Sequence, residues 1–444
     1  MRGEHILRGV NPRTRSKASK LPTRLVRFLA LVLITHLAAS AAAKAETAQS
    51  AGRFVDSIGM NVHLSYTNTA YGNVPELSRI VKDLGVRHLR DGITTGDAAP
   101  CRIARELGER GVRFDYITRP GIGRDALTAW ARCVGPVLEA YEGPNEYDIS
   151  HPRQDTNWVT TLQSYQQELY SSVKGTPALA KLAVIGPSAT TEQAYRSIGD
   201  LSAFMDYGNI HNYFAGRNPE TGGWGDNGYG SIAWNTRVAN VVMGAKTIET
   251  TETGYGTSSQ KPGVPLDVQA NYVPRMFLEQ FARDIPRTYE YQLLDGGGDA
   301  FDSFGLVSKD FQPKPAYDAL RSLIELLEEP ALDPATGSMS YRLSGSLTSV
   351  HHVLLKKHDG RYYLVLWLAA SDWDVNTSRR LTVPPQNVTL STDGAMKAAT
   401  LYQYDAQDRL RPVKRWGAVA SLTVDVKDSI SVVELVPADR RSGL

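Results

Sequence analysis

The chain has 444 residues and a formal net charge of +2, and 42% of its residues are hydrophobic against 22% that are charged. This composition is typical of folded globular proteins and excludes a disordered chain, a collagen-like fibre and a small disulfide-dense scaffold. The first 45 residues carry nine basic side chains and one acidic one, so the remainder has a net charge of −6. We therefore expect neither nucleic acid nor an anionic membrane surface as a partner.

Residues 1–45 have the layout of a secretory signal peptide. A basic region ends at Arg27, an apolar run of about 15 residues follows, and the small residues Ala43 and Ala45 flank Lys44. The apolar run is shorter than the ~20 residues of a membrane-spanning helix. We expect cleavage near Ala45, a secreted or periplasmic protein, and no stable membrane insertion after cleavage. An uncleaved anchor is the alternative.

The mature chain would contain two cysteines, Cys101 and Cys133. The helix pattern puts Cys101 in the first turn of one helix and Cys133 in the last turn of the next parallel helix. We expect that separation to exceed the ~7 Å Cα limit for a disulfide, although export favours a bond and the question stays open. Without a CxxC pair, a zinc site is not expected.

Between residues 54 and 327, short β-branched apolar runs alternate with helical stretches. This alternation predicts a parallel sheet, and its length matches a closed (β/α)8 barrel over residues 46–330. An open doubly wound sheet would carry a G-x-G-x-x-G turn after its first strand, where this chain has Asn61-Val62-His63-Leu64. The strands are expected at 55–63, 86–91, 112–117, 138–142, 182–186, 207–213, 246–251 and 288–293.

Residues 331–444 have a different hydrophobic pattern. Apolar runs separated by turns follow one another with little helical periodicity, and His358-Asp359-Gly360 is a hairpin signal between two of them. We expect a small antiparallel β-sandwich in this part of the chain.

Carboxylates stand where the fourth and seventh strands of the expected barrel end, which is the catalytic face of such barrels. Glu142 and Glu146 belong to the fourth strand and its loop, and we expect Glu142, which lies deeper, to orient a neighbour. Glu249 and Glu252 belong to the seventh, and their odd spacing predicts opposite faces, with Glu252 inside the barrel. Two carboxylates across one barrel mouth are what glycoside hydrolysis needs.

The segment Gly143-Pro144-Asn145-Glu146 resembles the Asn-Glu signature of the clan A retaining glycoside hydrolases. Thr251-Glu252-Thr253-Gly254-Tyr255 is similar to the nucleophile strand of that clan. The resemblance implies Glu146 as acid/base, Glu252 as nucleophile, and double displacement at O-glycosidic bonds of a poly- or oligosaccharide. It implies a carbohydrate partner and no cofactor or metal. A β-sandwich after the barrel is similar to families 39, 30, 51 and 79, and the choice among them stays open.

The resemblance also implies substrate-binding or positioning roles for further residues. Arg90, at the end of the second strand, matches an arginine that hydrogen-bonds the nucleophile, and Asn145 matches an asparagine that binds the sugar 2-hydroxyl. His211 and Tyr213 match a histidine and a tyrosine beside the nucleophile, and His63 is a floor contact.

Aromatic residues are the remaining candidates for sugar binding. The loop from 214 to 230 holds Trp224 and Tyr229, which we expect to form a substrate wall, and Tyr255 ends the nucleophile motif. The clan often has a tryptophan at the end of the eighth strand, but residues 288–295 contain none. The sugar and the linkage are therefore not predicted. The oligomeric state is not predicted either.

Other classes fit the sequence less well. A metal-dependent barrel hydrolase would have a His-x-His near the first strand, and a serine hydrolase would have G-x-S-x-G, which the segment 186–190 fails at its last position. A glycan-binding barrel without catalysis is the alternative function, although binding alone does not need an acid and a nucleophile. Structural carboxylates at helix N-termini are the simplest alternative for the glutamates.

Overall fold

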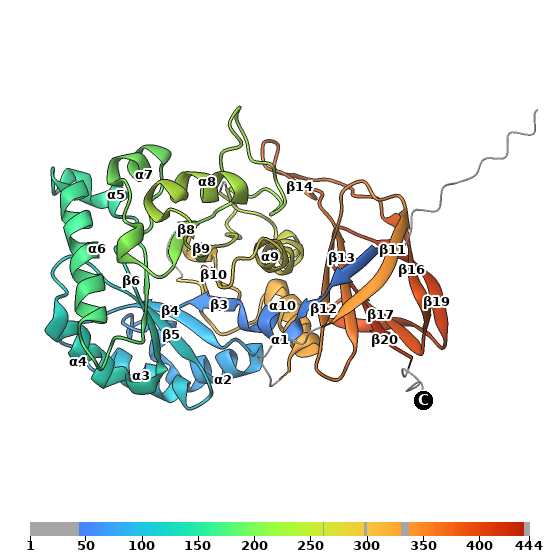
Figure 1. Cartoon of the computed structure of the whole chain (residues 1–444), viewed down its shortest axis with the longest axis horizontal. Helices are drawn as coiled ribbons and strands as arrows, with labels where there is room; N and C mark the ends of the chain where they lie inside the picture. The colour runs from blue at the N-terminus through green and yellow to red at the C-terminus, as the bar shows by residue number, and fades with distance from the viewer. Residues whose placement is uncertain (1–43, 261, 297–299, 330–336, 439–444) are drawn as a thin grey trace, which may run out of the picture. The chain divides into compact units, whose positions relative to one another are not determined.

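A computed structural model describes residues 44–260, 262–296, 300–329 and 337–438 (Figure 1). The predicted signal peptide lies outside these ranges, apart from residues 44 and 45.

Across the described ranges, every helix is too short or too polar to cross a lipid bilayer.

Eight parallel strands form one sheet in the order β7-β6-β5-β4-β3-β10-β9-β8, the expected number and direction. A parallel bridge between Ile185 and Tyr207 joins the two ends of this order and closes the sheet into a barrel. The strands are β3 (Ile58–Asn61), β4 (His88–Gly92), β5 (Arg113–Ile117), β6 (Leu138–Glu142), β7 (Ala183–Ile185), β8 (Gly208–His211), β9 (Ile248–Thr253) and β10 (Thr288–Glu290).

Helices follow the strands and cover the outside of the barrel (Figure 1). They are α1 (Ala51–Asp56), α2 (Val74–Leu84), α3 (Ala99–Gly108), α4 (Arg124–Val134), α5 (Tyr147–Ser150), α6 (Trp158–Lys174), α7 (Glu192–Ile198), α8 (Ile232–Met243), α9 (Leu266–Phe281) and α10 (Pro315–Leu327). Single 3₁₀ turns occur at η1 (Ala70–Gly72), η2 (Gly135–Val137), η3 (His151–Arg153), η4 (Ser202–Phe204) and η5 (Ala300–Ser303).

Helix α2 shows how local chemistry sets these elements. The Asn73 side chain caps its N-terminus by accepting from the amide of Glu76, and Pro75 fits the first turn, where no intrahelical donor is needed. Gly85 ends the helix in a left-handed conformation with φ of 83°. The apolar side chains of α2 recur every three or four residues, as in an amphipathic helix, and are fully buried: Leu77, Ile80, Val81 and Leu84.

The first strand is shorter than expected because its predicted start is helical. Ser50 accepts a hydrogen bond from the amide of Arg53 and caps α1, in which Phe54 and Val55 are fully buried. The strand begins only at Ile58. A short apolar run does not distinguish a buried helical turn from a strand, and here the serine cap favours the turn.

Strand β9 has one residue that is left without a partner in the neighbouring strand β8. Ile210 pairs with Thr250, but the next residue of β8, His211, pairs with Glu252, which leaves Thr251 as the extra residue. Such a bulge breaks the regular alternation of side chains between the two faces of a strand.

The prediction that Glu249 and Glu252 face opposite sides is wrong for this reason. The hydroxyl of Thr250 reaches Gln280 in the helix layer, whereas Glu252 contacts groups inside the barrel. Glu249 interacts electrostatically with Glu142, which is also inside the barrel, and burial raises the pKa of Glu249 to about 7. Both glutamates of β9 therefore face inward, with Glu249 lower and Glu252 at the mouth.

The prediction that the two cysteines lie too far apart is also wrong. Cys101 in α3 and Cys133 in α4 form a disulfide with their Cα atoms 5.9 Å apart. Their positions at the start of α3 and the end of α4 are as expected. The loop 93–98 that precedes α3 and a face of α4 that includes Cys133 line the same surface hollow.

The C-terminal part forms two sheets that share one apolar core, as expected for a sandwich, and every strand pair in them is antiparallel except β12 with β2. One sheet has the order β1-β11-β16-β19 and the other β18-β17-β20-β13-β12-β2. Its strands are β11 (Ser338–Gly345), β12 (Val350–Lys356), β13 (Tyr362–Leu368), β16 (Gln386–Met396), β17 (Ala398–Tyr404), β18 (Leu410–Trp416), β19 (Val419–Val426) and β20 (Ser431–Val436), with a separate hairpin of β14 (Trp373–Asp374) and β15 (Arg379–Arg380).

Residues 44–50 belong to this sandwich, although the sequence assigned the stretch from residue 46 to the barrel. Strand β1 (Lys44–Thr47) pairs antiparallel with β11, and β2 (Gln49–Ser50) pairs parallel with β12. These short strands cover sheet edges that would otherwise present unpaired backbone groups.

Candidate active site

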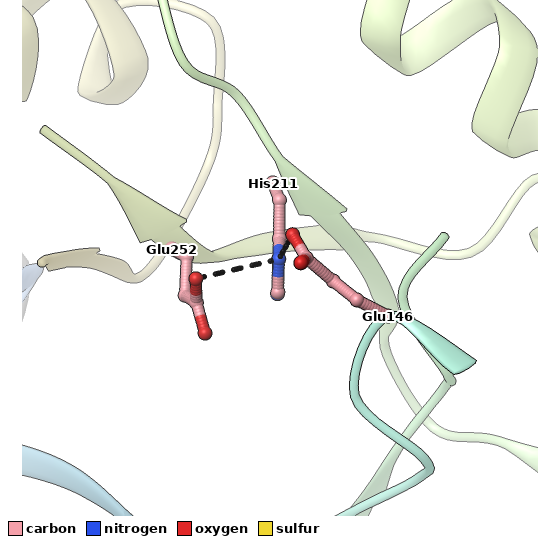
Figure 2. A group of neighbouring side chains, drawn as sticks. All are labelled: Glu146, His211 and Glu252. Carbon is pink, nitrogen blue, oxygen red and sulfur yellow. Dashed lines mark hydrogen bonds and ion pairs between the residues drawn. The ribbon is translucent and has the colours of Figure 1, made fainter. Parts of the chain in front are cut away.

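Three side chains from separate strands meet at the carboxyl end of the barrel. Glu146 follows β6, His211 ends β8 and Glu252 lies in β9, and the two carboxylates approach the imidazole from opposite sides (Figure 2). His211 Nδ1 lies 2.7 Å from Glu146 Oε1 and 3.6 Å from Glu252 Oε2. One carboxylate oxygen of each glutamate and one nitrogen of the imidazole lie within 4.8 Å of one another. The two carboxylates are close enough to act on one bond.

Arg90 lies under this group and is 1% exposed. Its Nη1 donates to Glu252 Oε1 at 2.7 Å, the contact that the sequence predicted. Its Nε and Nη2 each donate to one oxygen of Glu142 at 2.7 Å, so Glu142 orients the guanidinium as expected. Asn61 and Asn145 accept from the same guanidinium at 2.8 and 2.7 Å. Arg90 therefore connects four strands of the barrel.

The surroundings of Glu252 favour its ionised form. Burial raises the pKa of Glu252, but the charges of His211 and Arg90 and hydrogen bonds from Arg90 and Tyr213 outweigh burial and leave the pKa below its usual value. Tyr213 donates to Glu252 Oε2 at 2.9 Å, as the sequence suggested. Both carboxylate oxygens are thus held by donors.

Asp115 carries a second carboxyl group beside Glu142, deeper in the barrel. Burial, and next to it the charge of Glu142, raises the pKa of Asp115 well above its usual range. Both carboxyl oxygens of Asp115 are buried without a hydrogen-bond partner among the described residues, so the surroundings of Asp115 favour its neutral form.

The proton positions on His211 follow from its neighbours. The amide nitrogen of Asn209 donates to Glu142 and to the carbonyl of Gly186, so the Asn209 oxygen accepts the hydroxyl proton of Thr251 at 2.7 Å. Thr251 must then accept from His211 Nε2, which lies 3.1 Å away. With Nε2 protonated, any second proton lies between His211 Nδ1 and Glu146.

The charge on His211 is stabilised by both glutamates. Burial lowers the pKa of His211, but the charges of Glu252 and Glu146 and the hydrogen bond to Glu146 outweigh burial and raise the pKa above its usual value. The imidazole thus links the two carboxylates electrostatically.

The backbone around Glu146 explains why this motif has its sequence. A side chain at Gly143 would meet the backbone nitrogen of Pro187 at 2.9 Å, so only glycine fits that close approach. Glu146 itself has a left-handed backbone, with φ of 41° and ψ of 47°, which costs about 1–3 kcal/mol for a residue other than glycine. Its amide donates to Ser188 Oγ at 2.9 Å, which holds this conformation.

A cavity of about 400 Å³ opens beside the two glutamates. Tyr213, Tyr291 and Phe304 form much of its wall, together with glycines and apolar side chains of the loops after β8 and β9. Tyr291 lies just after β10, where the sequence lacked the expected tryptophan, and its ring packs edge-on against Phe304. An aromatic side chain is therefore present at this end of the eighth strand.

Two of the predicted binding residues contact the site from its edges. The ring of His63 stacks on Tyr66 at 5.0 Å and lies edge-on to Tyr291 at 5.7 Å, and burial lowers the pKa of His63. Tyr255 borders the cavity but is only 2% exposed, and its hydroxyl donates to the carbonyl of Arg217 at 2.9 Å. Tyr255 therefore supports the wall more than it faces a ligand.

The prediction that Trp224 and Tyr229 wall the substrate cavity is wrong for the cavity that the structure shows. The two rings lie edge-on at 5.1 Å, and the guanidinium of Arg217 covers the indole at 4.2 Å. Tyr229 also packs on Trp234 of α8 at 4.5 Å. These rings form the core of their own loop, a role that loop aromatics often have.

Four polar residues that complete the site were not singled out from the sequence. They are Asn61, Ser188, Asn209 and Thr251, all nearly or fully buried. The available signal was a polar residue inside an otherwise apolar strand or directly after it, because a buried polar group needs a partner. The partners themselves come from other strands and cannot be read locally.

Glu146, His211 and Glu252 also offer three ligand atoms of kinds that bind metal ions. A zinc ion would need each ligand atom at about 2.0–2.2 Å from itself. The 2.7 Å contact between His211 Nδ1 and Glu146 Oε1 is a hydrogen bond, and Arg90 already neutralises Glu252. The arrangement suits proton sharing better than metal coordination.

No protein-family model matches the chain, and no curated protein matches it. Solved structures do. A monomeric β-xylosidase from Caulobacter crescentus CB15 superposes with a TM-score of 0.58 at 13% identity, covering 88% of this chain and 98% of that one. A family 39 glycoside hydrolase from Bacteroides cellulosilyticus WH2 superposes with a TM-score of 0.53 at 15% identity, covering 86% of this chain and 82% of that one. A family 51 α-L-arabinofuranosidase from Thermotoga petrophila RKU-1 superposes with a TM-score of 0.55 at 11% identity, covering 88% of this chain and 100% of that one.

The chain therefore has the fold of the clan A glycoside hydrolases, a (β/α)8 barrel followed by a β-sandwich, as the sequence predicted. At these identities the likeness shows the fold, and the chemistry must be argued from the site.

Proposed function

We propose that this protein is a retaining glycoside hydrolase that acts on O-glycosidic bonds by double displacement. The observation that carries the proposal is the approach of Glu146 and Glu252 to within 4.8 Å across His211 at the mouth of the barrel. Retaining enzymes hold their carboxyl groups about 5–5.5 Å apart, whereas inverting enzymes leave about 6.5–9.5 Å for a water molecule. The spacing supports retention, and the glycoside hydrolases that share the fold support the reaction class.

In the first step, an oxygen of Glu252 attacks the anomeric carbon while Glu146 protonates the departing oxygen. Glu252 is suited to attack because Arg90, Tyr213 and His211 keep it ionised. As Glu146 gives up its proton it becomes a carboxylate, and the adjacent His211 stabilises that charge. In the second step, Glu146 takes a proton from a water molecule whose oxygen attacks the anomeric carbon. The bond between that carbon and Glu252 then breaks, which releases the sugar and restores the Glu252 carboxylate.

The residues around Glu252 hold its position and leave a polar group free for the substrate. Arg90 forms ion pairs with both Glu142 and Glu252, so its single positive charge is shared between two carboxylates. Asn145 accepts from Arg90 through its oxygen, which leaves its amide nitrogen to face the sugar 2-hydroxyl. Such a contact strengthens in the transition state.

Substitution of the two glutamates tests the roles on a panel of aryl glycosides. We expect Glu252→Gln to lose nearly all turnover, and Glu146→Gln to lose about 10²–10⁴-fold, with a smaller loss for substrates whose leaving group needs no protonation. Glu192→Gln, in a surface helix, is the matched control. A mechanism-based fluoro-sugar should label Glu252. Wild-type turnover in Glu252→Gln would overturn the assignment and favour a glycan-binding protein.

The predicted export signal supports a secreted or periplasmic location. Mass spectrometry of the protein from an expressing culture should give a mature N-terminus near Ala45 in the extracellular or periplasmic fraction. Full-length chain held in the membrane fraction would instead indicate an uncleaved anchor.

A further inference from the structure

We propose that the leaving-group side of this cavity takes an apolar aglycone, an aryl or alkyl group, instead of a second sugar. The inference rests on the proposed function only for the direction in which the leaving group departs, which is toward Glu146. The evidence for an apolar group comes from the side chains that line the cavity on that side.

The side of the cavity beside Glu146 can be identified from chain order. Ile149 lies three residues after Glu146 in α5, and Thr190 lies in the loop after β7, the strand next to β6 in the barrel. Both border the cavity together with Glu146. A group bonded to the oxygen that Glu146 protonates would therefore contact Ile149 and Thr190 first.

The wall offers apolar surface at this point. Ile149 is 58% exposed, which is unusual for an isoleucine beside a cavity, and Ala215, Pro262 and Phe304 continue the lining. Covering exposed apolar surface with an apolar group is favourable in proportion to the area removed from water. The described part of the lining contains no lysine, arginine, histidine, asparagine, glutamine or tryptophan.

Most hydroxyl groups of the lining are already used within the protein. Thr190 donates to Asp148 at 2.8 Å, Tyr213 donates to Glu252 at 2.9 Å, and Tyr255 donates to the carbonyl of Arg217 at 2.9 Å. Among the described lining residues, this leaves the hydroxyl of Tyr291. A second sugar would bring several hydroxyl groups away from water to a wall with few free donors, which is unfavourable.

Binding of 4-nitrophenol, a free aryl leaving group, tests the proposal without turnover. We expect the Glu252→Gln variant to bind 4-nitrophenol in an NMR titration. The double variant Glu252→Gln/Ile149→Asn should bind 4-nitrophenol about three- to tenfold more weakly. Val413→Asn is the matched control, because Val413 in the sandwich is 54% exposed, close to the value for Ile149. Unchanged 4-nitrophenol binding in the Ile149→Asn protein would overturn the proposal.

A second, kinetic experiment forms the glycosyl-enzyme of the wild type from any aryl glycoside that the protein hydrolyses, and measures which added acceptor captures that intermediate. Benzyl alcohol should capture the intermediate at lower concentrations than glucose or xylose, and Ile149→Asn should reduce that advantage. Better capture by the sugars would overturn the proposal. If no glycoside is hydrolysed, the proposed function fails, while the 4-nitrophenol titration still decides whether the cavity takes an apolar aglycone.

Discussion

Arg90 and Glu252 form a buried ion pair, with Nη1 and Oε1 2.7 Å apart, while the other face of the same guanidinium is held by Glu142. This relationship makes the charge of Glu252 depend on a residue 162 positions away in the chain. It also fixes the direction in which several properties of the protein should change when the pair is broken.

Arg90→Met should move the acid limb of the pH profile of kcat/KM to higher pH. Glu252 must be ionised to attack, and the loss of the arginine charge raises its pKa. The same change leaves Glu142 buried without its partner, so we expect the free energy of unfolding to fall by about 3–5 kcal/mol. pH–rate profiles and chemical denaturation measure the two effects. An acid limb at the wild-type pH would contradict the role of Arg90.

Arg90→Lys is the complementary variant. A lysine keeps the positive charge but cannot hold both oxygens of Glu142 and reach Glu252 at once. We expect a smaller shift of the acid limb than in Arg90→Met, with a clear loss of kcat.

His211→Asn should change how stability depends on pH. The pKa of His211 is raised in the folded state, so its protonation adds stability below the unfolded value of about 6.5, and this contribution disappears as pH rises through the folded pKa. The difference in unfolding free energy between wild type and His211→Asn should therefore be larger near about pH 6 than near about pH 9. A difference that is constant over this range would contradict a protonated His211.

Removal of the disulfide should destabilise the barrel without changing the site. Cys101 and Cys133 are 32 positions apart, and closing a loop of this length restricts the unfolded chain. We expect Cys101→Ser/Cys133→Ser to lose about 2–4 kcal/mol of unfolding free energy while kcat/KM at ambient temperature stays close to wild type. Denaturation of the oxidised and reduced wild type should show the same difference.

Trp367→Phe should weaken the contact between the barrel and the sandwich. The side chain of Glu220, in the loop after β8, is 1% exposed, and its Oε1 accepts from Arg275 of α9 and from Trp367 of β13, each at 2.8 Å. Loss of the indole donor should cost about 1.5–3 kcal/mol of unfolding free energy, the range for hydrogen bonds to charged groups. Because the same loop carries Ala215 at the cavity, KM should rise more than kcat falls.

Trp416→Phe, at the edge strand β18, is the control for that experiment. We expect it to leave KM at the wild-type value. If Trp367→Phe raised KM no more than this control does, the loop would not depend on the sandwich for its position.

The sequence by itself determined the parts of this protein that depend on local patterns. The alternation of apolar strands and amphipathic helices defined the eight-stranded barrel, and alternating runs with turns defined the sandwich. Glu146 and Glu252 were singled out because each stands where a strand ends, and the ends of parallel strands share one edge. Arg90 was singled out by the resemblance of its position to that of an arginine in clan A glycoside hydrolases.

Only the tertiary structure decided how residues distant in sequence are placed against one another. The bulge at Thr251 exists because β9 pairs with β8 and β10, and it turns Glu249 and Glu252 to the same face. The disulfide depends on how α3 and α4 pack against each other, and the cavity wall depends on Tyr291 and Phe304 meeting from separate segments. Periodicity reports which face of one element is buried, whereas register and packing are set by the partners of that element, which no local pattern contains.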